Sequence, residues 1–175
     1  GTIELCRGIQ RCLPHDSGFR AAAFHNEGVA LTLTRHTAQG LASLAEAERL
    51  ASALGVHVIE ANSLAWQGLV ALMDDDWARG APLIARAAHL VVRHDLDRLA
   101  TSAMCVTAMA LLQAARGSKG DARVTLGAAR RLTGQGIGAP AAGRAARVDL
   151  AGVPTSRRNP RIGSQRHRGR TRRRP

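Results

Sequence analysis

Apolar residues recur at intervals of three and four along most of the chain, a spacing that gathers them on one face of an α-helix. The clearest case is residues 57–73, where one stripe consists of Ile59, Asn62, Trp66, Leu69 and Met73. A second stripe follows in residues 77–94 and consists of Leu83, Ala87, Leu90 and Val91. Aspartates 74–76 separate the two stripes, and aspartate caps a helix start better than it continues a helix. The pattern predicts an antiparallel helix hairpin with apolar surface left for neighbours.

The same pattern occurs before and after this hairpin. We predict six helices in three antiparallel pairs, over residues 18–34, 38–54, 57–73, 77–94, 97–116 and 121–133. The second helices align on Thr37, Trp77 and Asp121, at offsets of 40 and 44 residues. A helix-pair repeat of this length is typical of an α-solenoid. No useful stretch alternates with the two-residue period of a strand, so we predict an all-α fold of stacked helix pairs.

The first residues resemble the end of a further helix, because Leu5, Ile9 and Cys12 share one face. The chain also lacks an initiator methionine, and we expect it to begin within the array as a fragment of a longer protein. No apolar run reaches the length of about 18 residues needed for a membrane helix, and no signal peptide is recognisable. Three cysteines, an odd number, suit a reducing compartment. We therefore expect a cytoplasmic protein.

Composition and charge change near Gly134. The formal net charge is +12, but residues 143–175 contain eleven arginines and a single acid, Asp149, while the preceding residues are nearly balanced. In the segment from Gly134 to Pro175, two thirds of the residues are glycine, alanine, proline or arginine, and the helical period stops. We divide the chain into a helical-repeat array, residues 1–134, incomplete at both ends, and a tail, residues 135–175, predicted to be disordered.

The tail has two interpretations. Its four dominant amino acids have codons that begin with two G or C bases, so a GC-rich gene read in a shifted frame would give this composition; we favour this interpretation. A genuine basic arm is the alternative. In that case nucleic acid would be bound by the clustered arginines Arg166, Arg168, Arg170, Arg172, Arg173 and Arg174.

No arrangement of residues indicates catalysis or metal binding. Cys6, Cys12 and His15 lack a fourth local ligand, and the aspartates at 74–76 lack the glycine and glutamate of a calcium loop. No nucleophile stands near a base and an oxyanion site. We predict that the chain is not an enzyme and that it holds no metal ion or cofactor.

Partner binding is the function that the array suggests. In helix-pair solenoids the first helices of successive pairs line the concave side. On the central first helix, Glu60, Ser63 and Gln67 form a polar flank, and we take them as candidates for a ligand or partner groove. Trp66 is expected to fill the core among alanines, so that truncation to alanine would cost about 3–5 kcal/mol.

Four segments carry a family resemblance: Ala45–Ala51, Ala65–Leu69, Gly80–Ala88 and Gly127–Leu132. They resemble the tetratricopeptide-like repeat region of large MalT-like regulators of the LuxR family, and the resemblance covers about residues 1–134. Such regulators join an ATPase domain, a helical-repeat array and a DNA-binding helix-turn-helix. The resemblance implies a non-catalytic interaction or sensor segment that binds a protein or small inducer on its concave face. ATP and promoter DNA would belong to domains absent from this chain. A nucleic-acid-binding protein that uses the basic arm is the alternative.

Overall fold

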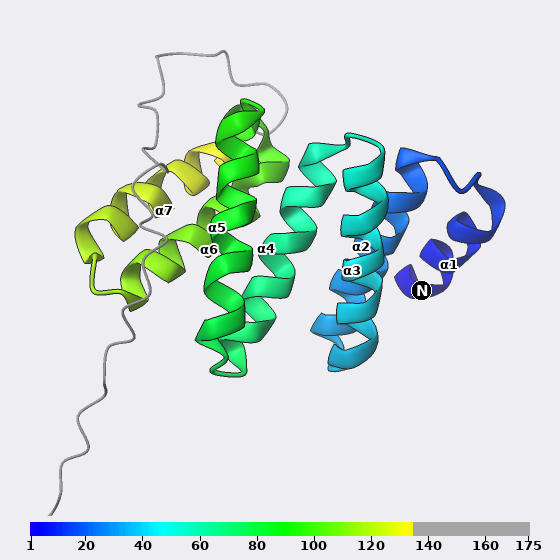
Figure 1. The fold of residues 1–175 in the computed structure, drawn as a ribbon, viewed down its shortest axis with the longest axis horizontal. Helices are drawn as coiled ribbons and strands as arrows, with labels where there is room; N and C mark the ends of the chain where they lie inside the picture. The colour runs from blue at the N-terminus through cyan, green and yellow to red at the C-terminus, as the bar shows by residue number, and fades with distance from the viewer. Residues whose placement is uncertain (135–175) are drawn as a thin grey trace, which may run out of the picture.

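Seven α-helices and two short 3₁₀ turns follow one another along residues 1–134, the part of the chain that the computed structural model describes (Figure 1). The α-helices are α1 (Thr2–Cys12), α2 (Gly18–Leu33), α3 (Thr37–Ala53), α4 (His57–Met73), α5 (Trp77–Arg93), α6 (Ala103–Ala115) and α7 (Lys119–Gly134). The 3₁₀ turns are η1 (Leu96–Arg98) and η2 (Ala100–Ser102). These residues contain no strand, and the all-α prediction is confirmed for them.

The helices form the stacked pairs that the sequence predicts. Helices α2 and α3, α4 and α5, and α6 and α7 pack as hairpins, and α1 packs against α2 like the second helix of an earlier pair. Figure 1 shows the pairs side by side along the long axis, from α1 at one end to α7 at the other. Each pair contacts the next one in the chain, so the architecture is that of a solenoid.

One predicted helix, residues 97–116, is wrong in its first part. The α-helix begins at Ala103, after the turns η1 and η2. Leu99, which lies between these turns, has an extended backbone with φ −87° and ψ 129°, and this conformation interrupts helical hydrogen bonding. The side chain of Leu99 is 43% exposed.

The turns between the helices of a pair repeat as regularly as the helices do. The second helices begin at Thr37, Trp77 and Lys119, so the second interval is two residues shorter than predicted, because α7 starts before Asp121. Two residues before each start, the backbone has a positive φ, at Arg35, Asp75 and Gly117. The Asp76 carboxylate accepts a hydrogen bond from the backbone N–H of Arg79 at 3.1 Å, which confirms its predicted capping role at α5.

In each of the first two hairpins, a pair of glycines lets the two helices approach closely. Gly28 and Gly40 face each other across α2 and α3, and Gly68 and Gly80 do so across α4 and α5. A Cβ placed on Gly68 would lie 2.6 Å from Ile84 Cγ1 and 3.0 Å from the carbonyl oxygen of Gly80. The backbones of these paired helices therefore approach so closely that a methyl group does not fit between them without movement.

The main core lies where α6 covers α4 and α5. Its largest fully buried side chains are Leu64, Ile84, Val91, Met109 and Leu112. Trp66, which was expected in this core, is only partly buried and belongs to none of the hydrophobic clusters in residues 1–134. The prediction was wrong because α4 is enclosed by α2, α3, α5 and α6, so its widest buried face is not the face with the largest side chain.

Candidate interaction surface

The first helices of the pairs lie along one side of the array. Helix α2 contacts α4 directly, and α4 contacts α6, whereas α3, α5 and α7 make no comparable contact with one another. The first helices are therefore closer together than the second helices, and they line the inner side of the stack.

The directions of the α4 side chains show which residues face this inner side. Ser63 contacts α2, Gln67 contacts α3, and Asn62 contacts α6 through Cys105. Gly68 faces α5. Successive residues of a helix are about 100° apart, so Trp66 and Met73 lie between the direction of α2 and the direction of α6. This side of α4 faces away from the second helices α3 and α5.

Large apolar side chains are exposed on this inner side. Met73 on α4 is 83% exposed, and Leu33, its equivalent one repeat earlier on α2, is 69% exposed. Phe19 on α2 is 78% exposed and stands one repeat before Ile59 of α4. Together with the partly exposed Trp66 we call these residues the inner apolar row. Large exposed apolar side chains repeated on neighbouring elements mark surfaces that bind another molecule.

The predicted groove residues lie beneath this surface and not on it. Glu60, Ser63 and Gln67 are all buried, because the neighbouring helices cover their side of α4. Ser63 Oγ is 3.0 Å from His25 Nδ1 of α2, and Gln67 Nε2 donates to Glu48 Oε2 of α3 at 3.3 Å. Each of them already contacts another helix, and a role in partner binding stays a prediction.

An ion-pair network joins three helices behind the inner apolar row. Arg86 of α5 contacts Glu48 of α3 at 2.8 Å and Glu60 of α4 at 3.0 Å. His57 lies 3.4 Å from Glu60 and stacks on His94 with 3.5 Å between ring centroids. Desolvation, with the charge of the neighbouring His57, lowers the pKa of His94. The network links α3, α4 and α5 across the junction between two consecutive pairs.

A similar contact fixes the first helix of the array. Arg7 Nε and Gln10 Nε2 of α1 each donate to the Glu27 carboxylate of α2 at 2.7 Å. Glu27 is buried and stands one repeat before Gln67, so the same position of the repeat carries the interhelical polar contact in both pairs.

Burial shifts the pKa values of two groups in the helix interfaces, His25 and Cys105. It lowers the pKa of His25 to about 4 and raises the pKa of the Cys105 thiol to about 12. The Cys105 thiol donates to Asn62 Oδ1 at 3.2 Å and is a buried, unreactive group. Among residues 1–134 no three histidine, cysteine or acidic side chains are grouped as metal ligands, and no helix there is long and apolar enough to cross a membrane.

Three sequence predictions fall on the tail, which lies outside the described residues. They are its disorder, the frame shift after Gly134 and the nucleic-acid site at Arg166, Arg168, Arg170, Arg172, Arg173 and Arg174. No family model, curated protein or solved structure matches the chain.

Phe19 and Leu33 were not predicted as surface residues from the sequence. They could have been found by counting back one repeat of 40 residues from Ile59 and Met73.

Proposed function

We propose that residues 1–134 are a non-catalytic interaction or sensor segment of a large MalT-like LuxR-family transcriptional regulator. The segment binds a protein or a small inducer along the inner side of its first helices. The exposed inner apolar row, of which Met73 is the most exposed member, carries this proposal. A soluble monomer exposes few large apolar side chains in one place unless the surface binds something. In such a regulator, separate domains bind ATP and promoter DNA, and the protein works in the cytoplasm.

The repeat architecture supports this function in a second way. Glycine crossings let the two helices of a pair approach closely, and the ion pairs of the half-exposed Arg86 with Glu48 and Glu60 join consecutive pairs. The first helices therefore present side chains at a regular spacing on a preorganised surface. Preorganisation lowers the entropy cost of binding, which is how repeat arrays recognise an extended segment or a bundle of helices.

Selection of displayed peptides on the whole chain tests the inner face as the binding surface. Selected peptides are then measured by fluorescence anisotropy against Met73→Glu and against Val92→Glu. Val92 is an exposed apolar residue on α5, a second helix, and is the matched control. We expect Met73→Glu to weaken binding at least about tenfold, since a charge would be desolvated in the contact, and Val92→Glu to leave it unchanged. Equal effects of the two substitutions would contradict the proposal.

The basic tail supports a second candidate function, nucleic-acid binding. Eleven arginines with one acid in residues 143–175 attract any polyanion, and this affinity falls steeply as salt rises. A double-stranded oligonucleotide of arbitrary sequence is titrated with the whole chain and with a chain ending at residue 134. Our proposal expects the shorter chain to lose DNA binding and to keep peptide binding. A sequence preference that survives at high salt in the whole chain would favour the alternative.

The identity of the parent protein has its own test. The DNA on both sides of this gene segment is sequenced, including the bases around codon 135. We expect an upstream frame that encodes an ATPase and a downstream frame that encodes a helix-turn-helix, with one shift after Gly134 restoring the helical period. Flanking frames without either domain would remove the LuxR assignment and leave the interaction surface to be judged by the peptide experiment.

A further inference from the structure

The two joints between consecutive helix pairs differ in what holds them together. We call the contact of α2 and α3 with α4 and α5 the first joint, and its connecting segment is Leu54–Val56. The contact of α4 and α5 with α6 and α7 is the second joint, and its connecting segment, residues 94–102, contains the turns η1 and η2. Helix α1 packs against α2 and so lies on the far side of the first joint from α4.

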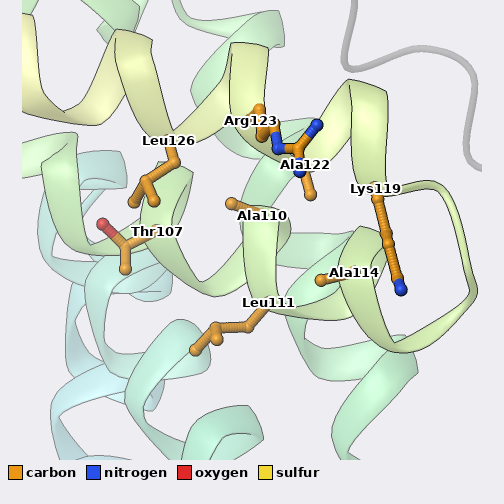
Figure 2. Close-up of a pocket in the computed structure, with 8 residues that line it drawn as sticks. All are labelled: Thr107, Ala110, Leu111, Ala114, Lys119, Ala122, Arg123 and Leu126. Atoms are coloured by element: carbon orange, nitrogen blue, oxygen red, sulfur yellow. The ribbon is translucent and has the colours of Figure 1, made fainter.

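Apolar packing closes the second joint. The main hydrophobic core of α4 and α5 is completed from α6 by Cys105, Ala108, Met109 and Leu112. A further cluster joins α6 to α7. Figure 2 shows the pocket of about 380 Å³ that α6 and α7 share; its lining residues all come from these two helices, so it lies within the pair and not at a joint. Opening the second joint would expose the main core to water, which is unfavourable.

Polar contacts are concentrated at the first joint. Ser63 Oγ of α4 lies 3.0 Å from His25 Nδ1 of α2. Glu48 of α3 accepts a hydrogen bond from Gln67 Nε2 at 3.3 Å and forms an ion pair with Arg86 at 2.8 Å. Across the second joint, the side-chain contact of this kind within residues 1–134 is the single thiol–amide hydrogen bond between α6 and α4. Charge therefore contributes to closing the first joint and not the second.

Little of the hydrophobic core crosses the first joint. The cluster of α2 and α3 is built around Ala21, Leu50 and Ala51, and Val56 and Ile59, both partly exposed, pack against it from the other side. Among the described residues, none of α1–α3 belongs to the main core. Polar groups released at this joint regain hydrogen bonds to water, so opening it costs less free energy than opening the second joint.

The ion pair of the first joint is accessible to salt. The side chains of Arg86 and Glu48 are 51% and 21% exposed, and dissolved ions screen such a pair more than a buried one. We propose that the first joint is a hinge, at which α1–α3 move as one body against α4–α7, and that salt opens it by screening the ion pair. The hinge goes beyond the binding function proposed above and needs no ligand.

Opening the hinge would change the inner apolar row. Leu33 of α2 and Met73 of α4 lie on opposite sides of the first joint, whereas Trp66 and Met73 belong to the same helix. The distance between Leu33 and Met73 therefore depends on the hinge, and the distance between Trp66 and Met73 does not. A partner that contacts both Leu33 and Met73 would favour the closed joint, a coupling that rests on the proposed function.

Pairs of spin labels on the whole chain test the hinge. The three native cysteines are replaced by alanine, and labels are attached at exposed positions through new cysteines. Ala45→Cys with Val92→Cys spans the first joint, and Val92→Cys with Val124→Cys spans the second. Distances are measured by double electron–electron resonance in low and high sodium chloride. Across the first joint the mean distance should shift, or its distribution broaden, by more than about 2 Å, and across the second joint it should not. No change across the first joint, or equal changes across both, would overturn the hinge.

Arg86→Gln and Arg49→Gln assign the movement to the ion pair. Arg86 pairs with Glu48 and Glu60 across the first joint, whereas Arg49 pairs with Glu46 of its own helix, so its loss crosses no joint. Arg86→Gln should broaden the distances across the first joint already at low salt and remove most of the further change with salt, and Arg49→Gln should do neither. Equal behaviour of the two variants would overturn the role of the ion pair. If Arg86→Gln lowers helix content, the salt series of the unsubstituted chain decides. Failure of the peptide selection would remove the proposed binding alone, because these distances are measured without a ligand.

Discussion

Replacing Gly68 by alanine tests the close approach of α4 and α5, on which the shape of the array depends. In an exposed helix interior this substitution stabilises by up to about 1 kcal/mol, because alanine has the higher helix propensity. At Gly68 the new Cβ would lie 2.6 Å from Ile84 Cγ1 and 3.0 Å from the Gly80 carbonyl oxygen. Relieving both contacts forces α4 and α5 apart within a close-packed core, which costs about 1–3 kcal/mol.

Gly127 provides the matched control for this substitution. It lies within α7, and a Cβ placed there would meet only the Arg131 guanidinium at 3.6 Å, an ordinary contact. The gain in helix propensity is common to both positions, so the difference between the two variants isolates the packing cost. We expect urea unfolding, followed by circular dichroism, to give a lower midpoint for Gly68→Ala and a higher one for Gly127→Ala. If both substitutions raised the midpoint equally, the close approach would be refuted.

Three further predictions concern the helix interfaces. Because the pKa of His25 is about 4 in the fold and 6.5 when unfolded, the unfolded chain binds this proton first, and stability should fall by up to about 3 kcal/mol between pH 6.5 and 4. His25→Gln should remove that loss from the pH dependence of the unfolding midpoint, and an unaltered profile would contradict the assignment. Arg86→Ala leaves the buried Glu60 carboxylate without its arginine and should cost about 1–2 kcal/mol in urea unfolding; an unchanged unfolding midpoint would argue against it. Ile84→Ala should cost about 2–5 kcal/mol and Trp66→Ala clearly less, and the reverse order would return Trp66 to the core.

The repeat period was readable from the sequence because it depends on local features. Apolar residues recur every three or four positions, and the chain turns near Asp75 and at Gly55, as it does at the equivalent positions of the other pairs. For five of the six predicted helices, both the first and the last residue lie within two residues of the observed bounds. The exception is the helix predicted over residues 97–116, where two 3₁₀ turns precede the start of α6 at Ala103. Propensity does not distinguish these conformations, since both follow similar local hydrogen bonding.

The sequence of a single helix did not reveal which of its faces is buried and which is exposed. Helix α4 touches α2, α3, α5 and α6, so polar side chains such as Glu60 and Ser63 are buried against neighbours, while Met73 remains exposed. A stripe of large apolar residues predicts one buried face, but a helix with several neighbours also buries small and polar side chains on its other faces. Aligning Leu33 with Met73, one repeat apart, would have suggested an exposed row, because an apolar side chain then recurs just before a turn in each pair.

Oxidation of Met73 in the presence of a selected peptide tests the central claim, that the inner apolar row is the binding surface. Met73 is largely exposed, and Met109 is fully buried in the core, so one chain contains both the probe and its internal reference. The rate of sulfoxide formation at each methionine is followed by mass spectrometry as the peptide is added. The account predicts that Met73 oxidation slows in proportion to the bound fraction while Met109 stays protected throughout. Binding at saturation that left the oxidation rate of Met73 unchanged would contradict it.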